Sequence, residues 1–138
     1  MGDDKGRVTG LGGIFFKTGD KAETLAWYRD RLGVQTTDFG SVFLWREHGD
    51  ADETGYTVWS PFAADTEYFA PSDAPFMVNF RVENLDALLT SLRAEGVRVV
   101  GGPVDEPNGR FAWIVDPEGR KIELWEPVPS KDDPYLAG

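Results

Sequence analysis

Two stretches of the chain share the same order of apolar and polar positions. Residues 13–17 alternate as a strand does, and apolar residues at helical spacing follow them up to Gly33. Residues 77–82 alternate in the same way, and a second helical spacing ends at Gly96. The glycines at positions 33 and 96 are 63 residues apart. The pattern therefore predicts two copies of one strand–helix unit.

The helix starts agree with this repeat, and each unit continues into further strands. Asp20, followed three residues later by Glu23, predicts one helix start, and Asn84 predicts the other. The further strands are predicted at 35–39, 41–47 and 55–62 in the first half and at 98–104, 110–115 and 121–126 in the second. The chain thus has the order βαβββ twice, with a linker at 64–75.

The predicted strands present two different faces. One face is aliphatic or aromatic and is expected to pack on the helices, whereas the other mixes polar groups with aromatic rings. The residues expected on each face are Phe16, Tyr56 and Phe80 against the helices, and Phe15, Trp59, Glu123 and Trp125 on the mixed face. A sheet with one apolar and one mixed face indicates a curved sheet around a cavity.

Composition supports a cavity and excludes several classes of function. The chain has 5 Trp, 4 Tyr and 9 Phe in 138 residues, more large flat side chains than a core of this size needs. Its formal net charge of −10 disfavours nucleic acid and anionic membranes as partners. Cysteine is absent and His48 is the single histidine, which excludes thiol catalysis and sites built from several histidines. No signal core or membrane-length apolar run is found, so a cytoplasmic location is expected.

Four segments resemble a known family. They are Gly-Gly-Ile-Phe-Phe-Lys (12–17), Ala-Trp-Tyr-Arg-Asp-Arg-Leu-Gly (26–33), Asn-Phe-Arg-Val (79–82) and Asp-Pro-Glu-Gly-Arg-Lys-Ile-Glu-Leu-Trp-Glu-Pro (116–127). Together they resemble the vicinal-oxygen-chelate superfamily, which includes glyoxalase I, ring-cleaving dioxygenases and bleomycin-resistance proteins. The resemblance implies an α+β fold in which paired βαβββ modules form a cupped eight-stranded mixed sheet, with the helices outside, usually in a homodimer.

The resemblance covers residues 8–128, as one domain made of repeats at about 8–63 and 76–128, with tails at 1–7 and 129–138. Enzymes of this family hold a divalent metal at four positions, which fall on Gly13, Thr57, Met77 and Glu123. Glycine has no side chain, the methionine sulfur is soft, and a threonine hydroxyl is a weak ligand. No cofactor is therefore expected, and a divalent metal is disfavoured.

Glu123 is the one carboxylate left at these positions, and its role stays open. It is a candidate general base or anionic partner for a cationic ligand, or else a structural carboxylate paired with Arg81, Arg110 or Lys17. The candidate ligand-binding residues are Phe15, Trp59, Phe69, Asn79, Trp113 and Trp125, each of which could instead belong to the core. Tyr68 and Phe69 lie in the linker and are expected to form a lid, a dimer contact or simply a docking point.

Three hypotheses for the function follow. The first is a metal-independent protein of the bleomycin-resistance type that binds a small aromatic or cationic molecule, which the net charge would attract. The second is a lyase, isomerase or dioxygenase of the glyoxalase type that uses Glu123 as a base or has an atypical metal site. The third is a partner-binding module without enzymatic activity.

Overall fold

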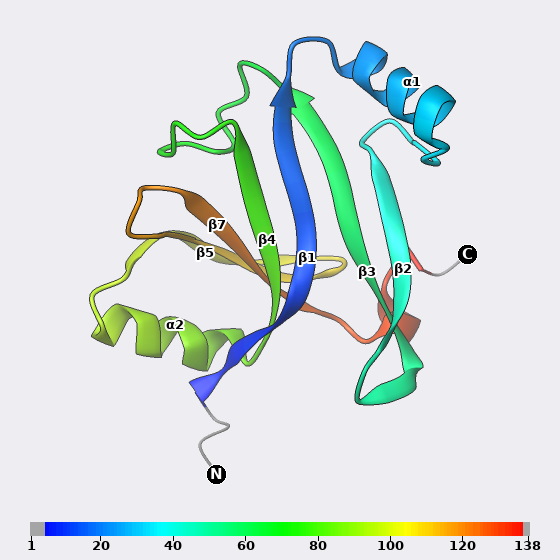
Figure 1. Ribbon diagram of the computed structural model, residues 1–138. Coiled ribbons are helices and arrows are strands. Elements are labelled where there is room, and N and C mark those ends of the chain that lie inside the picture. The colour runs from blue at the N-terminus through cyan, green and yellow to red at the C-terminus, as the bar shows by residue number, and fades with distance from the viewer. Residues whose placement is uncertain (1–4, 137–138) are drawn as a thin grey trace.

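The structure is a computed structural model that describes residues 5–136 (Figure 1). The predicted tails 1–7 and 129–138 therefore lie partly outside the described residues. The elements are β1 (Arg7–Thr18), α1 (Lys21–Leu32), β2 (Ser41–Glu47), β3 (Asp50–Ala63), β4 (Phe76–Glu83), α2 (Leu85–Ala94), β5 (Arg98–Glu106), β6 (Gly109–Val115), β7 (Lys121–Pro127) and a 3-10 turn (Ser130–Asp132).

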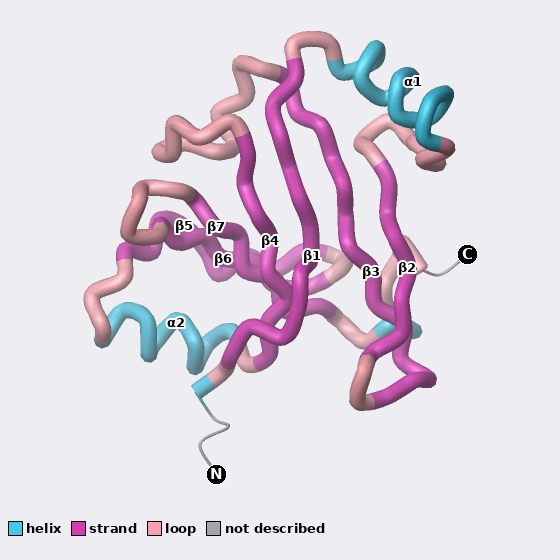
Figure 2. Tube along the Cα trace, viewed as in Figure 1, coloured by secondary structure: helices cyan, strands magenta, loops and turns pink. Residues whose placement is uncertain are grey.

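All seven strands pair into one mixed sheet in the order β2-β3-β1-β4-β7-β6-β5. The pairs β1·β3 and β4·β7 are parallel, and the other four pairs are antiparallel. β1, β2, β3 and β4 stand side by side, whereas β5, β6 and β7 run across them at an angle (Figures 1 and 2). The sheet is therefore curved, and its two ends come from the two halves of the chain.

The predicted strand at 35–39 is wrong, so the sheet has seven strands and not eight. This segment makes a local turn, in which the backbone N–H of Thr37 donates to the Gly40 carbonyl at 2.7 Å. Gly40 has a φ of 144°, and a side chain there would meet the backbone carbonyl of Trp59. The first half is thus βαββ, whereas the second half is the βαβββ unit expected.

Both helices begin and end where the sequence predicts, but they pack differently. Asp20 accepts a hydrogen bond from the backbone of Glu23 at 3.0 Å, and Gly33 ends α1 with a φ of 73°. α1 buries no residue, whereas α2 buries Leu85 and Leu89 against the sheet. Within the described residues, neither helix is long and apolar enough to span a membrane.

The segment after β7 docks on the first half of the molecule. Asp133 is 1% exposed and accepts a hydrogen bond of 2.7 Å from the hydroxyl of Tyr56 on β3. The backbone and the hydroxyl of Ser130 both donate to Glu53, also on β3. The sequence predicts a tail for the C-terminal segment. In the structure this segment instead packs against β3 of the first half.

Candidate functional site

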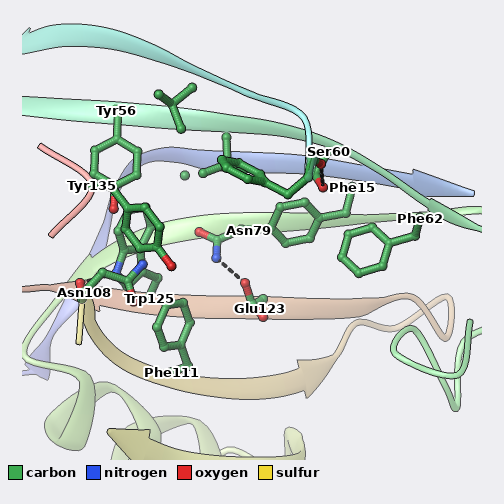
Figure 3. Close-up of a pocket in the computed structure, with 14 residues that line it drawn as sticks. Phe15, Tyr56, Ser60, Phe62, Asn79, Asn108, Phe111, Glu123, Trp125 and Tyr135 are labelled. Atoms are coloured by element: carbon green, nitrogen blue, oxygen red, sulfur yellow. Dashed lines mark hydrogen bonds between the residues drawn. The ribbon is translucent and has the colours of Figure 1, made fainter. Parts of the chain in front are cut away.

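A cavity of about 270 Å³ lies on the concave face of the sheet, between the two halves of the chain (Figure 3). Its volume is just below the ~300–1,000 Å³ of a typical site for a drug-sized molecule. Half of the lining residues are aromatic: Phe15, Phe39, Tyr56, Phe62, Phe111, Trp125 and Tyr135. The polar pair formed by Asn79 and Glu123 lies between two groups of these rings (Figure 3).

Glu123 is 3% exposed and is held by three hydrogen-bond donors. The side-chain amide of Asn79 donates to Oε1 at 2.5 Å. The indole N–H of Trp113 donates to Oε2 at 2.9 Å, and the hydroxyl of Tyr68 donates to the same oxygen. Because both oxygens are bonded, the carboxylate is fixed in place without a cation in direct contact.

The linker supplies Tyr68, whose hydroxyl contacts the wall residue Glu123. Burial and the nearby Glu123 raise the pKa of Tyr68 above its ordinary value, so its hydroxyl stays protonated at neutral pH and donates. Lys121 donates to the Tyr68 carbonyl at 2.7 Å, and burial lowers the pKa of this lysine while Glu123 opposes the change. Phe69 is fully buried next to Phe15. The linker thus packs behind the wall of the site, against Phe15 and Glu123.

None of the three cations considered as partners of Glu123 pairs with it. Arg81 bonds to Glu47 at 3.2 Å, and its guanidinium lies between the rings of Trp45 and Trp125, 4.9 Å and 4.8 Å from their centres. Arg110 pairs with Asp86 and Asp105, and Lys17 lies over the ring of Phe69. Glu123 is therefore not in an ion pair with Arg81, Arg110 or Lys17.

Strand register identifies which positions of the two halves correspond. Phe15 pairs with Ser60 across the parallel strands β1 and β3, and Asn79 pairs with Glu123 across β4 and β7. All four side chains line the cavity. The assignment of Thr57 as the counterpart of Glu123 is therefore wrong, because Thr57 bonds to Leu11 and Trp45 away from the cavity.

This corrected set of four residues does not fit a divalent ion. Phe15 offers no ligand atom, and the hydroxyl of Ser60 already donates to the carbonyl of Phe39 at 2.5 Å. This leaves Asn79 and Glu123 as the two ligand-bearing side chains of the set, and they are hydrogen-bonded to each other. Of the residues first assigned, Met77 is fully buried in the core, and Gly13 has no side chain. Within residues 5–136, no three His, Cys, Asp or Glu side chains lie together as a metal site requires.

The structure separates the candidate ligand-binding residues into two groups. Phe15, Asn79 and Trp125 line the cavity together with Glu123. Phe69 and Trp113 are not in the wall and support it from behind. The placement of Trp59 is wrong, because its ring packs on Tyr28 of α1, with the ring centres 4.5 Å apart.

Sequence reasoning also missed several wall residues. Tyr56 was expected against the helices, but it lines the cavity and contacts Trp125 edge-to-face at 5.1 Å. Ser60 was missed although it lies on the same strand face as Tyr56 and would follow from a correct face assignment. Gly12 approaches Asn79 so closely that a side chain at this position would meet the amide oxygen. Tyr135 was missed because the C-terminal segment carried no signal of docking.

Comparison with known proteins gives a family for the chain. The family model described as the glyoxalase/bleomycin resistance protein/dioxygenase superfamily matches residues 10–124. No curated protein matches the sequence.

Several solved structures share the fold. A methylmalonyl-CoA epimerase from Mycobacterium tuberculosis is 26% identical with a TM-score of 0.60, and the match covers 90% of this chain and 91% of that one. A variant of the Streptomyces coelicolor methylmalonyl-CoA epimerase, in complex with 2-nitronate-propionyl-CoA, is 17% identical with a TM-score of 0.65, covering 88% and 99%. A Mn(II)-bound glyoxalase from Novosphingobium aromaticivorans is 20% identical with a TM-score of 0.56, covering 88% and 40%.

Proposed function

The chain belongs to the glyoxalase/bleomycin resistance protein/dioxygenase superfamily, and on that premise we propose that it binds a small aromatic or cationic organic molecule in the cavity without a metal ion. One observation carries the proposal. The cavity wall is aromatic, and Glu123 is the one carboxylate among the described residues that line it. Planar rings stack on such a wall, and a buried carboxylate favours a positive charge.

The arrangement of Glu123 favours binding over catalysis. A general base needs a free lone pair within reach of the proton it removes. Both oxygens of Glu123 already accept hydrogen bonds from Asn79, Trp113 and Tyr68. These donors occupy three of the roughly four acceptor sites of the carboxylate, so little of it is left to take a proton from a substrate, whereas its charge still attracts a bound cation.

A screen by thermal shift tests the proposal. Aromatic amines, neutral aromatic compounds and divalent metals (Mg²⁺, Mn²⁺ and Zn²⁺) are added separately to the protein. We expect aromatic compounds to raise the melting temperature by mass action and to quench the fluorescence of Trp125, which lies in the wall. Divalent metals are expected to have no effect.

A matched pair of variants shows whether binding occurs in the cavity. Val58→Phe fills the cavity from β3, and Val8→Phe makes the same chemical change at a position that is 46% exposed. Val58→Phe should abolish the thermal shift, and Val8→Phe should retain it. Equal responses of the two variants, or no response of the wild type to any aromatic compound, would contradict the proposal.

A second function, a glyoxalase-type lyase, isomerase or dioxygenase, has one observation in its favour. Glu123 and the hydroxyl of Tyr68 form a carboxylate–phenol pair at the end of a cavity, an arrangement that can move a proton. Stoichiometric metal in the purified protein, or turnover that Glu123→Gln abolishes, would favour this function over binding. Binding of the same compounds by Glu123→Gln without any turnover in the wild type would exclude Glu123 as a base.

The quaternary structure and location stay predictions of the sequence. We propose the homodimer that the family resemblance implies, and sedimentation of the purified protein would test it.

A further inference from the structure

Several hydrogen-bond donors of the inner cavity wall already bond to acceptors of the protein. Four side-chain donors do so: Asn79 Nδ2 to Glu123, Ser60 Oγ to the Phe39 carbonyl, Tyr56 Oη to Asp133, and Trp125 Nε1 to the Asn108 carbonyl. Because a donated proton serves one strong hydrogen bond, these protons cannot also be donated to a ligand.

The same wall contains an acceptor that is unused. The side-chain oxygen of Asn79 is buried without a hydrogen-bond partner, although the residue is 2% exposed. Its amide nitrogen is turned towards Glu123, so the oxygen faces the other way, towards the group of rings that includes Tyr56 and Trp125 (Figure 3). Buried polar atoms in proteins almost always have a partner, which makes this atom a place where a ligand donor would bind.

The charges of the site also disfavour an anionic ligand. Glu123 is the only acidic or basic residue among those described in the cavity wall. Lys121, which interacts electrostatically with Glu123, is turned to the Tyr68 carbonyl outside the wall. An anionic ligand would thus meet the Glu123 carboxylate and the unused oxygen of Asn79, with no cation among the described wall residues to receive it.

We infer that the ligand is an aromatic compound carrying N–H donors, an amine or amidine rather than a carboxylate or phosphate, and that Asn79 Oδ1 receives one of these donors. The inference rests on the proposed function and specifies the chemical class of its ligand. The aromatic part packs among the rings, and the nitrogen-bearing end lies at Asn79 and Glu123. This pair therefore determines specificity, while the rings supply apolar contact.

Four probes of nearly the same shape test the inference by calorimetric titration at physiological salt. Benzamidine is a cation with N–H donors, benzamide is a neutral donor, acetophenone is a neutral acceptor, and benzoate is an anionic acceptor. We expect affinity to fall in that order, with benzamidine roughly tenfold tighter than acetophenone, as for a hydrogen bond to a charged group. Titration of Val58→Phe, in which the cavity is filled, measures the non-specific attraction of cations to the acidic chain.

Two substitutions at position 79 distinguish the role of the Asn79 oxygen as an acceptor from a role of this side chain in packing. Asn79→Leu removes the oxygen at similar volume, and Asn79→Asp keeps an oxygen at the same place. The preference for benzamidine over acetophenone should disappear in Asn79→Leu and be kept or increased in Asn79→Asp. A merely structural role for Asn79 would weaken all four probes alike in both variants, and that result would overturn the inference.

The wild-type protein tests the inference without any variant. Acetophenone or benzoate binding as tightly as benzamidine would overturn the inference and leave the proposed function standing. Failure of all four probes would also overturn it, and the wider screen of aromatic compounds then decides the proposed function separately.

Discussion

In the second half of the molecule, α2 buries Leu85 and Leu89 in an aliphatic core, but in the first half α1 buries no residue and contacts the sheet through aromatic rings. The cavity wall shows the same division. The first half contributes Phe15 and Ser60, and the second contributes Asn79 and Glu123 at the corresponding positions. A repeated architecture thus allows one half to provide stability and polar chemistry, and the other to provide an apolar wall.

The largest expected effect comes from a pair of leucine truncations that test this difference. Leu89→Ala removes a side chain that is 1% exposed and should lower the free energy of unfolding by about 2–5 kcal/mol. Leu32→Ala, at the end of α1, removes one that is 61% exposed and should change it by less than about 0.5 kcal/mol. Urea denaturation measures both. Similar losses in the two variants would show that the halves are equally stabilised by their helices.

The next test concerns the contact by which the C-terminal segment completes the first half. Tyr56→Phe leaves the buried Asp133 without the hydroxyl that donates to it, which should lower the free energy of unfolding by about 1–3 kcal/mol. Tyr135→Phe removes a hydroxyl from a residue that is 60% exposed and serves as the control. If the two variants unfold at the same urea concentration, the docked segment does not support β3.

Alkaline pH compares the first half, through Tyr56, with the linker that joins the halves, through Tyr68. Burial, reinforced by the hydrogen bond to Asp133 in one case and by Glu123 in the other, raises the pKa of both phenols above the ordinary value of about 10. The unfolded chain therefore loses these protons first. The free energy of unfolding should be unchanged below about pH 10. Above that pH it should fall, until the pH passes the pKa values of the two phenols in the folded protein.

Urea denaturation across this alkaline range measures the fall, and the single variants Tyr56→Phe and Tyr68→Phe should each make it shallower. A slope that neither variant changes would assign the alkaline loss to other groups.

The smallest expected effect is at a turn of the second half. The backbone N–H groups of Arg120 and Glu118 and the Arg120 guanidinium lower the pKa of Asp116. This carboxylate should stabilise the fold above its ordinary pKa of about 3.9, and the contribution should be lost as the pH falls below that value. Asp116→Asn should lower the melting temperature slightly at pH 7 and not at pH 3. A larger effect of Asp50→Asn, in the corresponding turn of the first half, would reverse the comparison.

Most of the fold could be predicted from the sequence because local signals determine it. Asp20 acts through its side-chain oxygen, and Gly33 and Gly96 act through their left-handed backbone, so the ends of the helices followed from residue type. The segment 35–39 was mispredicted because its hydrogen bonds are local to Gly40, and no apolar pattern distinguishes such a turn from an edge strand.

The candidate site was harder to predict because it depends on which strands pair. Alternation shows that Tyr56 and Trp59 point to opposite faces, but both are aromatic, so it cannot show which one faces the helices. The pairing of Ile14 with Trp59 decides this, and it joins residues 45 positions apart. Likewise, Thr57 was chosen by matching local sequence, whereas the pairing of Phe15 with Ser60 gives the true correspondence. Glu123, by contrast, lies in the most family-like segment and was identified correctly as a cavity residue.

The guanidinium of Arg81 lies between Trp45 of the first half and Trp125 of the second, so three side chains from different strands form one continuous stack. Such a stack restricts the rotation of Trp125, the ring that also faces the cavity. The wall is therefore ordered before any ligand arrives, and little conformational entropy remains to be lost on binding. A planar molecule that enters would encounter a rigid surface already in its bound shape.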